Sequence, residues 1–285
     1  MKIGLGLPNA VHSLRQGRRL VELARRADEL GFSSLATIGR MAYPSHEELI
    51  ALAAAAGATE RIGLMTDILL APTRDPLLLA KQAATLDQVS GGRFVLGVGV
   101  GSRPDDYAVT GDSFNDRGKR LDAALDLMHR AWRGEQVPGT DKPVTPRPVN
   151  NHSVPMMFGG RADQSIARVV RYGIGYTQGG GTPEGLRVMM DSVNTAWLEA
   201  GRSGKPQFRA LAYFTIGDET HTEAHANVMD YYAEWGAGVW TRTVKTAAEA
   251  KERVNRYEET GCDELLMFMT TPDVVQAERL AEAVL

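Results

Sequence analysis

The sequence predicts a single α/β domain over residues 1–285, a (β/α)₈ TIM barrel with insertions in its loops. Short β-rich apolar runs alternate with longer stretches of helical periodicity along the whole chain. Eight such strand–helix units suit 285 residues, because this barrel needs about 250. No linker rich in Ser, Gly and Pro divides the chain into separate domains.

The strands are expected where apolar and β-branched residues cluster, at 2–7, 34–38, 62–70, 93–98, 155–158, 174–178, 208–216 and 264–269. The helices are expected where apolar residues recur every three or four positions, at 16–30, 46–58, 76–89, 116–133, 163–172, 183–200, 219–233, 247–260 and 273–284. A long loop separates the fourth strand from its helix.

Local signals support the first three helices. Gly31 follows the apolar stripe of the first helix as a C-terminal stop. Ser45, with Glu48 three positions later, forms a capping box for the second. Asp75 and Pro76 open the third, since proline suits a first helical turn.

Two stretches fall outside the regular alternation and are expected to cover a site or a subunit contact. Residues 134–154 are rich in Pro and Asn, and residues 234–246 carry two tryptophans. The aromatic residues around the second stretch can form a lid over an apolar substrate, a dimer contact or ordinary packing; they are Tyr231, Tyr232, Trp235 and Trp240.

Composition excludes several classes of protein. Apolar residues make up 43% of the chain and charged residues 24%, which excludes intrinsic disorder. The net charge of −3 gives no positive field for nucleic acid or an anionic membrane. The longest apolar run, 49–58, is too short to span a bilayer, and the single Cys262 excludes an internal disulfide. We expect a cytoplasmic protein whose partners are small molecules or proteins.

In a barrel of this kind, function concentrates in the loops that follow the strands. The fourth strand ends in Gly97-Val98-Gly99-Val100-Gly101, where absent side chains let a flat ring or a phosphate approach the backbone. Pro104 occupies the third glycine position of a dinucleotide-binding fingerprint, so that motif is excluded. The alternative is that these glycines only relieve packing.

The fifth strand is followed by Gly159-Gly160-Arg161-Ala162-Asp163, directly before a helix. Free backbone N–H groups and a guanidinium meet there, as a phosphate site requires, although a plain tight turn also uses Gly-Gly. After the sixth strand, Thr177-Gln178-Gly179 supplies a second glycine-rich rim. Three such tips favour an extended ligand with a planar head and a phosphate.

Longer segments resemble a known family. They are 23–32 (LARRADELGF), 76–87 (PLLLAKQAATLD), 90–99 (SGGRFVLGVG), 118–122 (GKRLD), 159–161 (GGR) and 171–173 (RYG). Together they resemble the luciferase-like class of flavin- or deazaflavin-dependent oxidoreductases, the bacterial luciferase-like monooxygenase family. The match covers nearly the entire chain.

The resemblance implies a (β/α)₈ barrel that holds a flavin ring over the strand tips, with a cis peptide at or near Asp67–Ile68. It places Thr66, Asp67 and Ile68 beneath the ring and Gly99 and Gly101 beside it. The phosphate would lie among Gly159, Gly160, Arg161, Ala162 and Asp163. It also implies that Arg120 reaches the phosphate, the alternative being a solvent-facing or structurally paired arginine.

One stretch departs from the family pattern. Many relatives carry an acidic residue and a histidine after the second strand, whereas residues 37–41 read Thr-Ile-Gly-Arg-Met. The candidate catalytic residues are therefore Arg40, which can stabilise a negative charge or sit at the rim, and His12, which can donate a proton or remain solvated. The catalytic acid stays unassigned. No metal is expected, since His221 and His225 lack the glutamate of a zinc-protease helix.

The leading hypothesis is a monooxygenase that uses reduced FMN, supplied by a separate flavin reductase, and O₂ on a small organic substrate. The alternative is hydride transfer with the deazaflavin coenzyme F420, which the missing histidine disfavours. A third hypothesis is a flavin-binding protein without turnover. The family resemblance also implies a homodimer.

Overall fold

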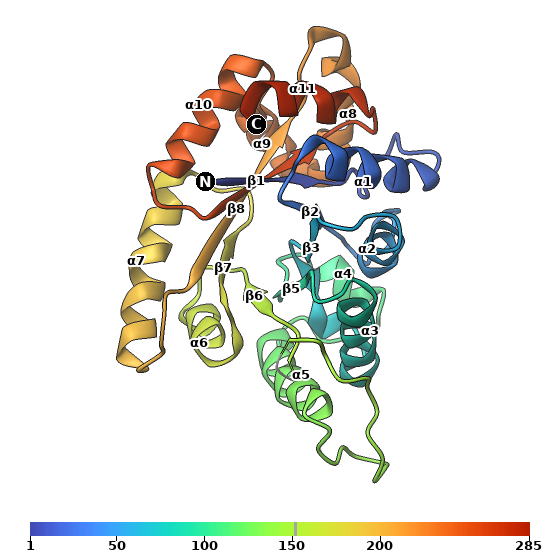
Figure 1. Cartoon of the computed structure of the whole chain (residues 1–285), viewed down its shortest axis with the longest axis vertical. Coiled ribbons are helices and arrows are strands. Elements are labelled where there is room, and N and C mark those ends of the chain that lie inside the picture. Colours follow the sequence, from blue (N-terminus) through green and yellow to red (C-terminus); the bar gives the residue numbers. More distant parts are fainter. Residues whose placement is uncertain (151–152) are drawn as a thin grey trace.

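The computed structural model describes residues 1–150 and 153–285, where nine parallel strands form one closed sheet (Figure 1). The strands are β1 (Lys2–Gly6), β2 (Ser34–Thr37), β3 (Gly63–Thr66), β4 (Leu69–Leu70), β5 (Phe94–Gly99), β6 (Met156–Phe158), β7 (Gly175–Gln178), β8 (Gln207–Phe214) and β9 (Glu264–Met269). Their order is β3-β2-β1-β9-β8-β7-β6-β5-β4, and β3 also pairs with β5, which closes the ring.

The predicted eight-stranded barrel is confirmed, with one difference in its third strand. Residues 62–70 form β3 and β4 rather than one continuous strand, and both pair with β5. The break falls at the Asp67–Ile68 peptide, which is cis, as the family resemblance implied. The two pieces therefore count as one strand of the barrel.

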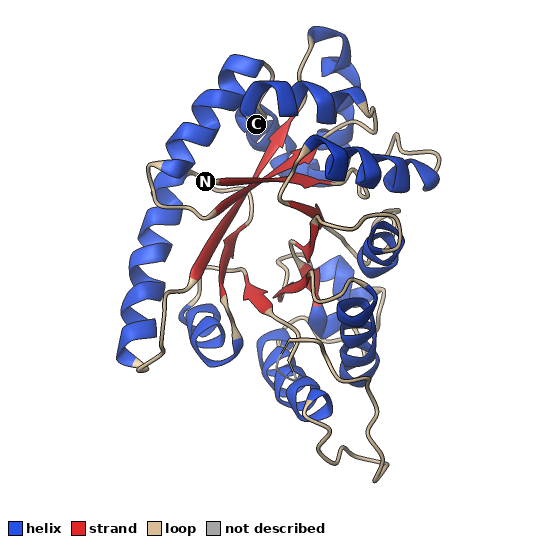
Figure 2. Cartoon of the chain, viewed as in Figure 1, coloured by secondary structure: helices blue, strands red, loops and turns tan. Residues whose placement is uncertain are grey.

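Helices surround the ring of strands (Figure 2). They are α1 (Arg18–Leu30), α2 (Glu48–Ala56), α3 (Pro76–Val89), α4 (Pro104–Ala108), α5 (Arg117–Trp132), α6 (Asp163–Tyr172), α7 (Pro183–Glu199), α8 (His221–Tyr232), α9 (Gly236–Arg242), α10 (Ala247–Glu258) and α11 (Val275–Val284). Three 3₁₀ turns join them: η1 (Ala71–Thr73), η2 (Asp218–Thr220) and η3 (Ala233–Trp235). None of the described helices is both long and apolar enough to cross a bilayer.

Two of the three predicted helix-end signals are confirmed. Gly31 ends α1 with a left-handed φ of 98°, and the Asp75 side chain accepts a hydrogen bond from the Leu78 N–H at the start of α3. The Ser45 cap of α2 is wrong. Glu47 caps that helix through the Ile50 N–H instead, because its other carboxylate oxygen is held by Arg74 at 2.6 Å.

The core has two layers. The larger one fills the space between the strands and the helices. A smaller one lies inside the barrel and contains Ala36, Met65, Met157, Leu211, Tyr213, Leu266 and Phe268. A buried ion pair, Arg209 Nε to Glu264 Oε2 at 2.9 Å, joins β8 to β9, and the Ser34 hydroxyl donates to Glu264 at 2.7 Å. These layers leave the carboxyl ends of the strands available for a site.

The two insertions lie in different places. Residues 134–150 and 153–154 lie in a long loop segment between α5 and β6, and 151 and 152 lie outside the described residues (Figure 1). Asp87 of α3 anchors this loop by accepting hydrogen bonds from the Val149 N–H and the Asn150 side chain. The second insertion folds into η3 and α9, after α8.

Candidate active site

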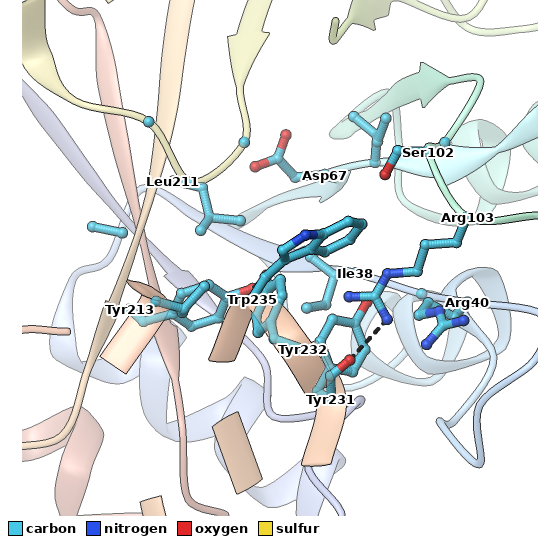
Figure 3. A pocket seen from close by; sticks show the side chains of 18 of the residues that line it. Ile38, Arg40, Asp67, Ser102, Arg103, Leu211, Tyr213, Tyr231, Tyr232 and Trp235 are labelled. Atoms are coloured by element: carbon cyan, nitrogen blue, oxygen red, sulfur yellow. Dashed lines mark hydrogen bonds between the residues drawn. The ribbon is translucent and has the colours of Figure 1, made fainter. Parts of the chain in front are cut away.

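A cavity of about 780 Å³ opens where the strands end. The segments that follow β2, β5, β6 and β7 line it, together with β8, α8 and α9. Figure 3 labels ten of its lining residues, from Ile38 after β2 and Asp67 between β3 and β4 to Tyr231, Tyr232 and Trp235 on α8 and η3. The cavity therefore lies at the end of the barrel where the sequence predicted function.

The break between β3 and β4 shapes the floor of the cavity. Ile68 lines the cavity and lies directly against Gly99, where an added Cβ would be only 2.0 Å from its Cδ1 atom. Thr66 is fully buried, and its hydroxyl donates to the Gly97 carbonyl at 2.7 Å. Gly99 thus accommodates Ile68, whereas Gly101 lines the cavity itself with a left-handed φ of 65°.

Asp67 is a buried acidic side chain of the cavity lining, with 5% of its surface exposed. Its Oδ1 atom accepts a hydrogen bond from the Thr177 hydroxyl at 2.6 Å, and its Oδ2 atom has no partner among the described residues. Burial raises the pKa of Asp67 to about 7, although the Thr177 hydrogen bond and the Arg209 charge oppose the rise. A carboxyl group that carries a proton near neutral pH can act as a hydrogen-bond donor.

The start of α6 lies next to Arg161 of the cavity lining. No described side chain caps this helix, so its first N–H groups have no side-chain acceptor among the described residues. Gly160 has a φ of 116°, and an added Cβ would lie 2.5 Å from the Ser165 hydroxyl. Arg161 lines the cavity beside them, while Ala162 and Asp163 form the exposed helix start. Helix N–H groups beside a guanidinium suit a phosphate.

At the equivalent position after β7, the start of α7 already has hydrogen-bond partners within the protein. The Thr182 hydroxyl caps α7 by accepting from the Gly185 N–H at 3.2 Å. With its amide turned to satisfy both atoms, Gln178 donates to the Thr182 carbonyl and accepts from the Leu186 N–H. Of the predicted 177–179 rim, only Gly179 lines the cavity.

Comparison with known proteins agrees with this geometry. A family description, "Luciferase-like monooxygenase", matches residues 1–277. The chain belongs to the luciferase-like monooxygenase family. The uncharacterized protein Rv0940c of Mycobacterium tuberculosis is 31% identical over 229 residues, which are 69% of this chain and 78% of that protein.

Solved structures share the luciferase-like barrel. Monooxygenase RslO1 from Streptomyces bottropensis superposes with a TM-score of 0.82 and 21% identity over 99% of this chain and 98% of the other. An F420-dependent secondary alcohol dehydrogenase, in complex with an F420-acetone adduct, has a TM-score of 0.79 and 20% identity over 99% and 98%. This chain is accordingly an oxidoreductase of the luciferase-like class.

Two carboxylates of α4 hold the Arg40 side chain in position. Arg40 lines the cavity and pairs with Asp105 and, at 3.2 Å, with Asp106 of α4. Burial lowers the pKa of Arg40, but the two carboxylates outweigh it and leave the pKa raised. Arg40 is therefore a permanent positive charge whose two nearest partners neutralise it.

Two further predicted residues lie outside the cavity of this luciferase-like protein. His12 is half-exposed and lies 3.7 Å from Asp230. Arg120 pairs with Asp112 and donates to the Pro72 carbonyl at 2.8 Å. Arg120 thus has the contacts of a structurally paired arginine in this structure.

Sequence reasoning missed part of the cavity lining. Tyr213, Tyr231, Tyr232 and Trp235 form an aromatic wall, and the Tyr213 and Tyr232 hydroxyls lie 2.5 Å apart. Arg103 holds this wall by stacking 5.0 Å from the Trp235 ring centroid and donating to the Tyr231 carbonyl at 2.8 Å. The sequence indicates Tyr231, Tyr232 and Trp235 as candidates for a lid. It gives no signal for Arg103 and Tyr213, because neither belongs to a motif.

Proposed function

We propose that this protein is a monooxygenase that uses reduced FMN and O₂ to oxygenate a small apolar or aromatic substrate. One observation carries the proposal: the uncapped start of α6, with Arg161, lies at the rim of a cavity with an aromatic wall. The helix start fits a single phosphate, and the cavity fits a flat ring beside an apolar molecule.

The residues of the chain would act by binding, positioning and excluding water. Arg161 and the α6 amides would hold the phosphate, and Ile68 and Leu70 would support the ring from the floor. The aromatic wall would keep water from the substrate. When bound, reduced FMN would supply two electrons to O₂, so that one oxygen atom enters the substrate and the other leaves as water. A separate flavin reductase would regenerate the cofactor.

A second candidate function is hydride transfer with F420, and a group of arginines favours it. Arg161, Arg242 and Arg253 all line the cavity, and none of them is within 4 Å of a carboxylate among the described residues. Within the described part of the chain, the Arg253 guanidinium donates only to the Arg242 carbonyl, at 3.1 Å. Such a charge excess suits a cofactor with several anionic groups, which F420 carries in its side chain.

Cofactor titration under anaerobic conditions tests the proposal. Reduced FMN should bind with a micromolar or lower Kd, and O₂ uptake should then depend on a substrate drawn from an aldehyde, sulfonate and aromatic panel. Binding of F420 without binding of reduced FMN would reverse the order of the two candidates. FMN binding without any O₂ uptake above that of free reduced FMN would favour a flavin-binding protein without turnover.

A further inference from the structure

One oxygen of the buried Asp67 carboxyl group has no hydrogen-bond partner among the described residues. The side chain lines the cavity and is 95% buried, and Thr177 satisfies only one of its two oxygens. The other oxygen, Oδ2, is shielded from solvent and has no hydrogen bond within the described chain. An unsatisfied buried oxygen is costly, so the site is incomplete without a ligand atom at this point.

The charged and titratable groups that face Asp67 do not supply a hydrogen-bond partner for its Oδ2 atom. Arg209 of β8 and Glu264 of β9 are engaged with each other at 2.9 Å, and Arg209 makes no ion pair with Asp67 among the described residues. The tyrosines that face it from β7, β8 and α8 stay neutral because burial raises the pKa of each one; they are Tyr176, Tyr213 and Tyr232. No histidine is among the cavity-lining residues that the structure describes.

We propose that Asp67 carries a proton on Oδ2 and donates it in a hydrogen bond to a nitrogen or carbonyl oxygen of the cofactor ring. This inference rests on the proposed function, since it needs a ring in the cavity. It gives the site the acid that the loop after β2 lacks, because Arg40 there is engaged by Asp105 and Asp106. A carboxylate at this position would offer the ring no donor and would repel its acceptor atoms.

The proposal predicts that ring binding and protonation of Asp67 are linked. Burial raises the pKa of Asp67 to about 7, so the free protein loses this proton as the pH rises through neutrality. A ligand that needs the proton must then bind more weakly above pH 7 and must take up a proton from solution when it binds. Neither effect is expected if Asp67 is only a packing residue.

The experiment is a fluorescence titration with FMN at about pH 6 and pH 8.5, on the wild type, Asp67→Asn and a control, Asp87→Asn. The wild-type Kd should rise about tenfold or more with pH. The Asp67→Asn Kd should stay nearly constant, because its amide keeps a donor at both pH values. Asp87 is buried far from the site against Val149, so its variant should follow the wild type. The FMN phosphate titrates equally in all three proteins.

A second variant tests the inference even if Asp67→Asn fails to fold. The Thr177 hydroxyl lowers the pKa of Asp67, so Thr177→Val should move the pH midpoint of FMN binding upward while keeping the carboxyl group. Equal pH dependence in the wild type and Asp67→Asn, or an unmoved midpoint in Thr177→Val, would overturn this inference alone. A wild-type protein that binds neither FMN nor F420 at either pH would overturn the proposed function as well.

Discussion

At the scale of single residues, the contacts of each arginine show whether its charge is paired within the protein or is available to a ligand. Arg168 is 7% exposed and is held by Asp122 and the Gly118 carbonyl, and Arg120 is held by Asp112. Arg161 has no such partner among the described residues and lies at the start of α6. Side chains of the same type therefore differ in what they can offer a ligand, and only the tertiary contacts reveal the difference.

Replacing Arg161 with Ala should weaken FMN binding by about 10- to 100-fold, the usual cost of losing one hydrogen bond to a charged group. Riboflavin, which has the same ring and no phosphate, should bind the variant about as well as the wild type. Arg171→Ala is the matched control, because Arg171 lies on the same helix and pairs with Asp126. Equal losses for FMN and riboflavin would exclude a phosphate site at Arg161.

Asp67 should also make the free energy of unfolding depend on pH. Its pKa is about 7 in the folded protein and 3.8 when unperturbed, so the folded state holds the proton more tightly. The stability gained from this proton is full below about pH 4 and disappears as the pH rises through 7. Relative to the wild type, Asp67→Asn should therefore gain a few kcal/mol in its free energy of unfolding between pH 4 and pH 7.5. Urea unfolding measures this, and a constant difference would show that Asp67 is ionised in the folded state.

At the scale of elements, the starts of α6 and α7 form a contrasting pair. Each follows a barrel strand and a glycine-rich turn. Thr182 and Gln178 satisfy the first turn of α7, whereas no side chain that the structure describes caps α6. A helix start that the protein leaves uncapped beside a cavity is available to an anion, and one that is already capped is not.

The wall built by α8 and η3 makes a second prediction at this scale. Trp235 is 47% exposed and packs under Arg103, so Trp235→Ala should change stability little but open the cavity to water. We expect a higher KM for substrate and a larger share of the consumed O₂ released as hydrogen peroxide. Trp240→Ala is the control, because Trp240 packs on His225 and Lys245 away from the cavity. The same behaviour in both variants would contradict a substrate-facing wall.

At the scale of the whole molecule, the ion pair inside the barrel links the strands beneath the site. Glu264 of β9 is 4% exposed, pairs with Arg209 of β8, and accepts from the Ser34 hydroxyl of β2. Glu264→Gln removes the charge and leaves Arg209 buried without a counter-ion, which should cost about 3 to 5 kcal/mol in urea unfolding.

Two comparisons make that measurement specific. Replacing both members, Arg209→Met with Glu264→Leu, should restore most of the lost stability, because no buried charge is left alone. The exposed pair Arg256–Glu184 should respond differently, with no measurable change in Glu184→Gln. A Glu264→Gln protein as stable as the wild type would show that the pair is not needed for the barrel.

The sequence alone determined the fold, because the barrel depends on patterns that are local in the chain. Alternating strand and helix signals predicted every strand of the barrel, and the motif segments predicted the family. The same local reasoning failed at the start of α2, where Arg74, far along the chain, makes Glu47 rather than Ser45 the cap.

Only the tertiary structure decided which side chains meet at the cavity. It placed Arg161 and Asp67 there, bound Thr177 to Asp67, engaged Gln178 at the start of α7, left His12 outside, and added Arg103 with the aromatic wall. The physical reason is that a side chain's availability depends on its partners, and a partner such as Asp67 for Thr177 lies 110 residues away in the chain. Periodicity places an element on the barrel, but it carries no information about which hydrogen bond or ion pair a side chain has already made.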